Sequence, residues 1–245
     1  MEDVAPDALI NKDDGRKYWD GVDADDNGML GGLLKGGFSN LSRLDLQGSR
    51  TFLAKLGIGA KPPLRVVGAA LEGGAGVGRV TNGLMVNVAK EVDIIEPTVK
   101  FTDAIEARDR VRTVFNVGLE EWKPRDETRY DLVWVQWCVG HLTDDQLVEF
   151  LKRCQSVLNA GGFIVLKENL STSGVDLFDD LDSSVTRYVS SVSVPKRQIP
   201  SDRYVQGGEQ VSGHLQECWP EDIQDGAAES ISILAVPGAN VGFDS

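Results

Sequence analysis

The chain has 245 residues with an ordinary hydrophobic fraction of 41%, and 38 acidic against 25 basic side chains give it a net charge of −13. That length is enough for one large domain with a packed core. The acidic balance argues against a surface that binds nucleic acid, and no apolar run is long enough to span a membrane.

The three cysteines, Cys138, Cys154 and Cys218, have neither paired nor metal-ligand spacing, which is typical of free thiols in a reducing compartment. Residues 1–14 lack the apolar core of a signal peptide. We therefore expect a protein of the cytoplasm, with the nucleus as the alternative, and no structural metal. We also expect a monomer.

The first quarter of the chain is predicted to be an extension in front of the main domain. Residues 1–14 are polar and acidic, which indicates a disordered segment, and a short helix or lid with Tyr18 and Trp19 follows. Residues 21–37 are rich in glycine and aspartate and predict a loop. Residues 43–56 carry apolar side chains at helical spacing.

From residue 64 onward, strand and helix patterns alternate. Strand-like runs fall at residues 64–70, 91–95, 111–117, 130–137 and 162–167, and helical patterns at residues 79–90, 98–107 and 143–158. This alternation predicts an α/β fold with an open, mostly parallel sheet wrapped by helices. In such sheets ligands bind beyond the carboxyl ends of the strands.

A glycine-rich turn follows the first strand-like run. Gly74, Gly76 and Gly78 allow the backbone to turn sharply and approach a ligand, and Glu96 ends the next strand some twenty residues later. This layout is typical of a loop that holds a nucleotide and a carboxylate that grips a ribose. Dehydrogenases and methyltransferases both use it, and it can also be an ordinary tight turn.

Glu72, just before the glycines, discriminates between these two classes. A carboxylate there would repel the pyrophosphate of a dinucleotide, whereas it is compatible with the cationic sulfonium and amino group of S-adenosylmethionine. We therefore expect S-adenosylmethionine and disfavour a dehydrogenase.

Polar and aromatic side chains follow the fourth and fifth strands. Trp137 and His141 are expected to face the crevice, and Thr143 to cap the helix that follows. The other interpretation is an aromatic core strand with an incidental histidine. An acidic cluster at residues 179–187 follows the fifth strand; it is either a solvated loop or part of a substrate site.

Together these motifs resemble the protein α-N-terminal methyltransferases, which methylate the free amino terminus of other proteins. The similarity covers about three quarters of the chain and rests on residues 18–19, 27–32, 74–79, 135–137, 140–143 and 182–187. It implies a Rossmann-like class I methyltransferase sheet with helices on both faces and a short helical N-terminal extension. The glycine loop is generic, but the later motifs are specific to this family.

The resemblance implies two sets of binding residues. Those for S-adenosylmethionine are Gly74, Gly76 and Arg79 around its methionine part, Glu96 at the ribose, Leu119 and Glu120 beside the adenine, and Gln136 near the carboxylate. Those for the peptide are Trp137 on the proline at position two, Asn169 on the backbone, Asp179, Asp182 and Ser184 around the amino group and the cation at position three, and Trp19 in the cover of the channel.

The implied substrates are protein N-termini that begin Xaa-Pro-Lys after removal of methionine, such as those of ribosomal proteins. An acidic channel favours the ammonium form of the substrate and so raises its pKa, which means that a base must take the proton before methyl transfer. His141 and Asp182 are the candidates; alternatively, His141 orients the substrate or caps the helix. A non-catalytic adaptor that binds N-termini and a small-molecule methyltransferase remain the alternative functions.

After Arg187 the sequence departs from the family. Strand-like runs at residues 188–194 and 231–236 flank a glycine- and acid-rich stretch with weak helical period. We therefore expect a methyltransferase domain over residues 15–187. Residues 188–245 should form a divergent, partly disordered segment with a degraded strand pair, which leaves the last parallel strand with an open edge and impairs activity.

Overall fold

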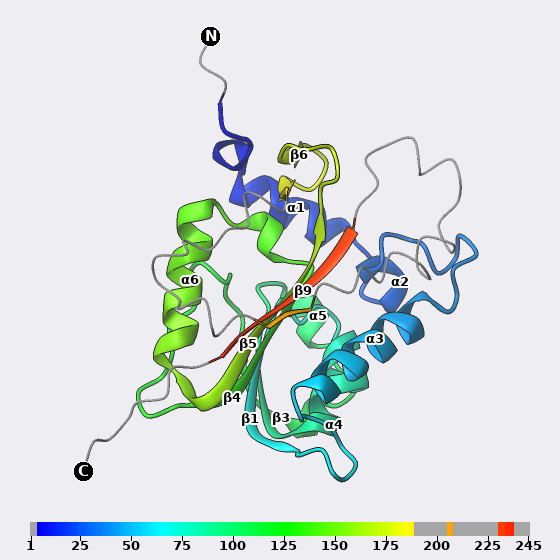
Figure 1. Cartoon of the computed structure of the whole chain (residues 1–245). Helices are drawn as coiled ribbons and strands as arrows, with labels where there is room; N and C mark the ends of the chain where they lie inside the picture. The colour runs from blue at the N-terminus through cyan, green and yellow to red at the C-terminus, as the bar shows by residue number, and fades with distance from the viewer. Residues whose placement is uncertain (1–3, 189–204, 208–229, 238–245) are drawn as a thin grey trace.

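The computed structural model describes residues 4–188, 205–207 and 230–237 and has an α/β fold built around one sheet (Figure 1). The strands are β1 (Val67–Gly73), β2 (Ala89–Ile95), β3 (Val111–Phe115), β4 (Tyr130–Gln136), β5 (Leu158–Leu170), β8 (Val205–Gly207) and β9 (Ser230–Pro237). In this described part of the chain, these seven strands are hydrogen-bonded in the order β3-β2-β1-β4-β5-β9-β8.

Strands β1 to β5 pair in parallel, which confirms the predicted parallel sheet. The central residues of β1, β2 and β4 are almost continuously buried because helices cover both faces of the sheet. From β1 the chain builds outward to β2 and β3 on one side and then to β4 and β5 on the other. The direction of building therefore changes between β1 and β4, and at such a topological switch point the carboxyl ends of the two strands leave a crevice where a ligand can bind.

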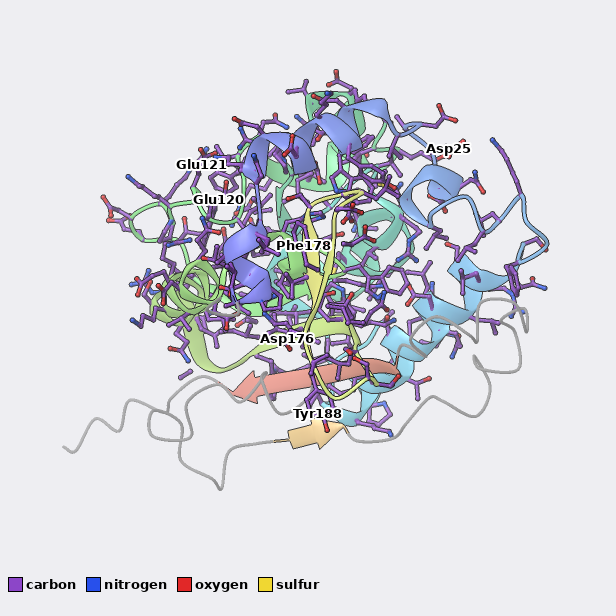
Figure 2. The ribbon with its side chains drawn as sticks, turned by 90° about the horizontal axis from the view of Figure 1, so that it is seen from above. Asp25, Glu120, Glu121, Asp176, Phe178 and Tyr188 are labelled. Atoms are coloured by element: carbon purple, nitrogen blue, oxygen red, sulfur yellow. The ribbon has the colours of Figure 1, made fainter. Side chains whose placement is uncertain are left out.

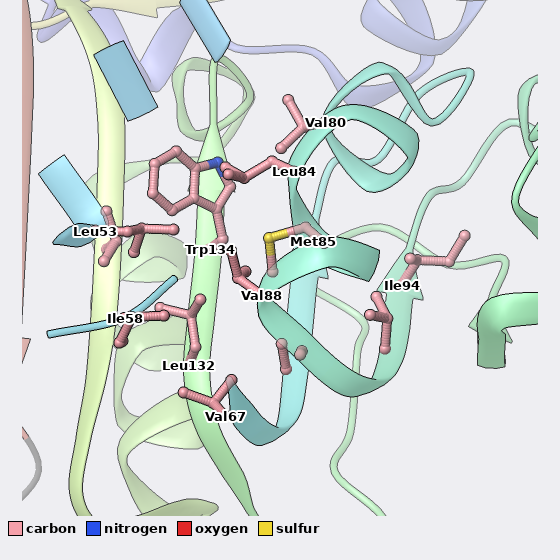
Figure 3. Packing of buried hydrophobic residues seen from close by; sticks show 14 of the residues in the cluster. Leu53, Ile58, Val67, Val80, Leu84, Met85, Val88, Ile94, Leu132 and Trp134 are labelled. Atoms are coloured by element: carbon pink, nitrogen blue, oxygen red, sulfur yellow. The ribbon is translucent and has the colours of Figure 1, made fainter. Parts of the chain in front are cut away.

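Two apolar layers hold the helices to the sheet. On one face lie α3 (Leu41–Lys55), η2 (Thr81–Met85) and α4 (Val86–Val88), and Figure 3 shows Leu53 and Met85 beside Trp134 of β4. On the other face, α6 (Asp144–Ser156) packs its Phe150 against Trp122. Thr143 caps α6 as predicted, in a capping box that fixes where this helix begins.

The helices predicted at residues 79–90 and 98–107 are shorter in the structure. The first is divided between η2 and α4, and the second is reduced to α5 (Val99–Thr102), followed by η3 (Arg108–Arg110). One reason is that the Asn82 side chain accepts the backbone N–H of Ala107, which takes this donor out of a regular helical ladder.

The N-terminal extension differs from the expected disorder over residues 4–14. It forms η1 (Pro6–Leu9), α1 (Lys12–Gly21) and α2 (Asp26–Met29). The Asn11 side chain caps α1, and its backbone N–H donates to Ser183 Oγ at 2.8 Å. Asp7 in turn accepts the backbone N–H of Asp144 at 3.0 Å. Contacts with distant residues therefore order a segment whose composition alone suggests disorder.

The expectation of an open edge on β5 is wrong, because β9 pairs antiparallel with it along eight residues. The strand-like run at residues 231–236 thus lies in β9, and β8 pairs with β9 in turn. The remaining expectations for residues 189–204, 208–229 and 238–245 lie outside the described residues.

A small hairpin of β6 (Leu177–Asp179) and β7 (Ser184–Thr186) stands apart from the sheet. Among the helices described, none has the length and apolarity needed to cross a membrane.

Candidate active site

A cavity of about 220 Å³ lies at the carboxyl ends of the central strands, beneath α1. All seven predicted cofactor-binding residues line it, as do Trp19, Trp137 and His141. Helix α1 contributes Gly15 and Arg16 as well as Trp19, so the N-terminal extension forms one wall of the cavity. The predicted cofactor and substrate regions therefore meet in one space.

The glycine loop needs glycine for two physical reasons. Gly74, Gly76 and Gly78 have φ angles of +69°, +54° and +82°, which side chains rarely tolerate. A Cβ would also lie 2.5 Å from Cys138 Sγ at Gly74 and 2.6 Å from Met29 Sδ at Gly76. Glycine therefore lets the backbone itself form this wall of the cavity without strain.

Glu96 follows β2 and is buried in the wall of the cavity. Its Oε2 accepts the backbone N–H of Gly76, and its Oε1 that of Thr98, both at 2.9 Å. Burial raises the pKa of Glu96, although these two hydrogen bonds oppose the shift. Each carboxylate oxygen keeps a second lone pair, so Glu96 can hold the loop and still accept ribose hydroxyls.

Glu72 lies near the end of β1 and its carboxyl accepts the Thr81 hydroxyl at 2.8 Å. Burial raises the pKa of Glu72 to about 8, although the bond from Thr81 and the charge of Arg79 act in the opposite direction. At neutral pH the group is therefore mostly protonated, and the full-charge repulsion of pyrophosphate inferred from the sequence does not operate. A cation beside it would lower this pKa, so the position still suits a sulfonium better than a pyrophosphate.

Asp45 of α3 organises a buried charge cluster that the sequence analysis missed. Its carboxylate binds Arg79 Nη1 at 2.7 Å, Gln136 Nε2 at 3.0 and 3.1 Å, and the Lys167 ammonium. Burial alone would raise the pKa of Asp45, but Lys167 and Arg79 together lower it. Two cations against one carboxylate leave the cluster net positive, which suits the carboxylate of S-adenosylmethionine. The one signal in the sequence is an acid within the apolar helical run at residues 43–56.

The two residues predicted to flank the adenine also line the cavity. Leu119 is buried, and Glu120 forms an ion pair with Lys12 of α1 at 2.9 Å. The adjacent Glu121 binds Lys12 and, at 3.0 Å, Arg16. Figure 2 shows both glutamates beside the N-terminal helices. Glu120 therefore fastens α1 over the cavity, in addition to any contact with the cofactor.

Trp137 follows β4 with a strained φ of +56°. Glu168 accepts the next two backbone N–H groups at 2.8 and 2.9 Å, which holds this turn in place. The Arg79 guanidinium and the Lys167 ammonium lie 5.2 and 5.6 Å from the centre of its ring. The indole N–H is buried without a partner in the described residues, so Trp137 has a donor available for a ligand.

His141 and Asp182 approach each other at the substrate side of the cavity. His141 Nε2 lies 3.9 Å from Asp182 Oδ2 and accepts the indole N–H of Trp19 at 3.0 Å. Shielding from water lowers the pKa of His141, and the charge of Asp182 offsets this only in part. A neutral imidazole with a lone pair is competent to act as a base.

The remaining predicted substrate residues do not line the cavity. Asn169 lies within β5, in register with Ile231, and Asp179 is exposed at the end of β6, where it accepts the backbone N–H of Leu181. Ser184 begins β7, and Asp182 lies in the connection between β6 and β7. Of these four side chains, Asp182 is tied to the cavity through His141, and Ser183, which was not predicted, lines it.

The residues present fit S-adenosylmethionine. The parts of that molecule are matched by a wall of glycines with positive φ, by two buried acids for its cation and diol, and by a net-positive cluster for its carboxylate. The geometry thus agrees with a methyl donor, and the comparisons with known proteins identify the family.

The profile of the family described as AdoMet dependent proline di-methyltransferase matches residues 7–199. The chain belongs to this family. Similar proteins are named N-terminal Xaa-Pro-Lys N-methyltransferase 1 in Danio rerio, 42% identical over 69% of this chain and 75% of the relative, and in Homo sapiens, 38% identical over 70% and 76%. The α N-terminal protein methyltransferase 1 of Schizosaccharomyces pombe is 41% identical over 71% of this chain and 78% of its own length.

A solved SAM-dependent methyltransferase of Leishmania major has the same fold, with a TM-score of 0.69 and 27% identity over 91% of this chain and 81% of the other. Membership of the family makes this chain an S-adenosylmethionine-dependent methyltransferase, which confirms the predicted cofactor, fold class and family. The individual roles of the site residues remain predictions.

Replacing Glu96 with alanine is expected to weaken S-adenosylmethionine binding by about 1.5–3 kcal/mol, because charge-assisted hydrogen bonds to the ribose are lost. Isothermal titration calorimetry measures the change. Glu91→Ala is the matched control, since Glu91 is an exposed acid of β2, the strand that Glu96 follows, and does not line the cavity. Equal affinity of the Glu96 variant and the wild type would contradict the ribose assignment.

Proposed function

We propose that this chain transfers methyl groups from S-adenosylmethionine to the α-amino group of proteins that begin Xaa-Pro-Lys. The observation that carries the proposal is the meeting of the glycine loop with Trp137 and His141 in one cavity, beside an acidic hairpin. The names of relatives around 40% identical support the same substrate class. A small-molecule methyltransferase would have no need for the acidic cluster at residues 179–187.

The chain's residues account for the steps around methyl transfer. S-adenosylmethionine supplies an electrophilic methyl group on a positively charged sulfur. Asp182 Oδ1, buried without a partner among the described residues, can accept a hydrogen bond from the entering α-ammonium group. His141 Nε2 can then take one proton, which leaves the amine lone pair free to attack. Further rate enhancement comes from alignment of amine and methyl in the narrow cavity.

Three finer points belong to the same proposal. The physiological substrates include ribosomal proteins and other abundant chains that expose Xaa-Pro-Lys once methionine is removed. The enzyme acts as a monomer, since the cofactor and substrate groups named above all come from the described residues of one chain. It acts in the cytoplasm, or in the nucleus, where such substrates occur.

Transfer of label from S-[methyl-³H]adenosylmethionine to an Ala-Pro-Lys or Ser-Pro-Lys peptide tests the proposal. We expect labelling of the free-amine peptide and none of the same peptide with an acetylated N-terminus, because an amide nitrogen has no basic lone pair to attack with. Mass spectrometry of the product places the methyl group on the terminal nitrogen.

Equal labelling of the acetylated peptide would indicate a side-chain lysine methyltransferase. Peptide binding in calorimetry without any labelling would indicate an adaptor that recognises N-termini without methylating them. Failure to bind the peptide, together with normal binding of S-adenosylmethionine, would leave a small-molecule substrate as the conclusion.

A further inference from the structure

Trp19 makes a direct hydrogen bond to the candidate base. Its indole Nε1–H donates to His141 Nε2 at 3.0 Å, and the two rings meet edge to face with their centres 6.0 Å apart. A histidine nitrogen that accepts an N–H bond carries no proton itself, so this contact requires the neutral imidazole with its proton on Nδ1.

The opposite side of the imidazole is also held in place. The backbone of Ser183 hydrogen-bonds the ring, and a Cβ on Gly15 of α1 would be in ordinary van der Waals contact with Nδ1, at 3.6 Å. That Cβ would also lie 3.1 Å from the backbone oxygen of Asp182. Helix α1 therefore contacts both the imidazole and the loop that carries the candidate acid.

The charges around the ring are few and identifiable. Asp182 Oδ2 lies 3.9 Å from Nε2, and the charge of Glu120 acts on the ring from the loop after β3. Lys12 Nζ and Arg16 Nη2 of α1 lie 2.9 and 3.9 Å from Glu120 Oε1 and partly neutralise its charge. The indole N–H of Trp19 occupies the lone pair of His141 Nε2. His141 itself lines the cavity.

We propose that Trp19 is a positioning residue that keeps His141 neutral and its Nε2 lone pair directed at the cavity until the α-ammonium group of the peptide replaces the indole N–H. This rests on the proposed function. The ammonium N–H replaces the indole N–H at the same lone pair of Nε2. Before the peptide binds, the base is therefore already hydrogen-bonded to Trp19. The ammonium then gives one proton to Nε2, and its nitrogen keeps the electron pair that forms the new bond to carbon. As the carbon–sulfur bond breaks, sulfur keeps its electrons, and the imidazolium later releases its proton to water.

The Trp19→Phe variant tests the proposal because phenylalanine keeps an aromatic ring but has no N–H. A hydrogen bond to the neutral form of histidine lowers its pKa, so losing the bond should raise the pKa of His141 by about half to one unit. Nitrogen-15 NMR of the full-length protein measures this directly, because the chain has only two histidines, His141 and His214. The fraction of His141 with its proton on Nδ1 should fall in the same variant.

Trp122→Phe is the matched control. Trp122 is buried beneath α6, and its indole N–H has no partner within the described part of the chain. This variant also removes an indole N–H, but the titration of His141 should remain that of the wild type. Superimposable His141 titrations for Trp19→Phe and the wild type would overturn the proposal, whether or not the protein methylates peptides.

A second measurement uses the unmodified protein and tests the exchange itself. In the presence of S-adenosylhomocysteine, an Ala-Pro-Lys peptide should shift the Trp19 indole resonance, whereas its acetylated form should not. In the pH profile of kcat/KM, the acidic limb reports the pKa of His141, so Trp19→Phe should shift this limb to higher pH by the same half to one unit. The limb of the same profile that reports the pKa of the peptide amine should stay at the same pH. A mere packing role of Trp19 would raise KM alike at every pH and would contradict the proposal.

Discussion

Replacing Asp182 with asparagine is expected to lower the turnover number about 10²- to 10⁴-fold while leaving S-adenosylmethionine affinity almost unchanged. Asparagine keeps the size of the side chain but removes the negative charge that the α-ammonium group meets. Asp182 lies beside His141 and does not line the cofactor part of the cavity. Steady-state kinetics with a Ser-Pro-Lys peptide and calorimetry with the cofactor separate the two effects.

Asp180→Asn is the control for this prediction. Asp180 is exposed two residues earlier in the same connection, so its variant loses the same net charge without changing the surroundings of His141. Its turnover should remain close to that of the wild type. If Asp182→Asn weakened cofactor binding as strongly as turnover, Asp182 would be a structural residue and the assignment as a catalytic group would fail.

Replacing Asp45 with alanine is expected to lower the free energy of unfolding by about 3–5 kcal/mol at pH 7. The variant would leave the Arg79 guanidinium and the Lys167 ammonium buried without their carboxylate. Burial already lowers the pKa of Lys167 despite the nearby Asp45. Chemical denaturation of the full-length chain, followed by tryptophan fluorescence, measures the change.

The same cluster predicts how the difference depends on pH. Because Asp45 has a lowered pKa in the folded state, its stabilising contribution is present above the unfolded-state pKa of about 3.9 and is lost as the pH falls through the folded-state value. The difference in the free energy of unfolding between the wild type and Asp45→Ala should therefore become smaller below pH 4.

Adding Lys167→Met to Asp45→Ala should restore part of the lost stability, because one buried charge no longer lacks a partner. The single variant Lys167→Met provides the reference for this double-mutant cycle. Equal stability of Asp45→Ala and the wild type at pH 7 would mean that the buried cluster is not a stabilising feature of this fold.

The amino-acid sequence by itself determined the parallel sheet and the position of the cofactor loop. Strand and helix periodicities are local properties, so the predicted runs lie within a few residues of β1 to β5 and α6. Gly74 and Gly76 are required by backbone geometry at a single turn, and Glu96 follows from the length of one strand–helix–strand unit. Family-specific motifs at residues 135–143 and 182–187 likewise directed attention to Trp137 and His141.

Only the tertiary structure decided which distant residues meet. Trp19 and His141 are 122 positions apart, and Asp45 and Gln136 are 91 apart, so no local pattern links them. The N-terminal extension is ordered by partners such as Ser183, and β9 covers an edge that its own pattern could not assign to β5. Periodicity reports the structure that a segment can adopt, whereas its partners depend on how the whole chain packs.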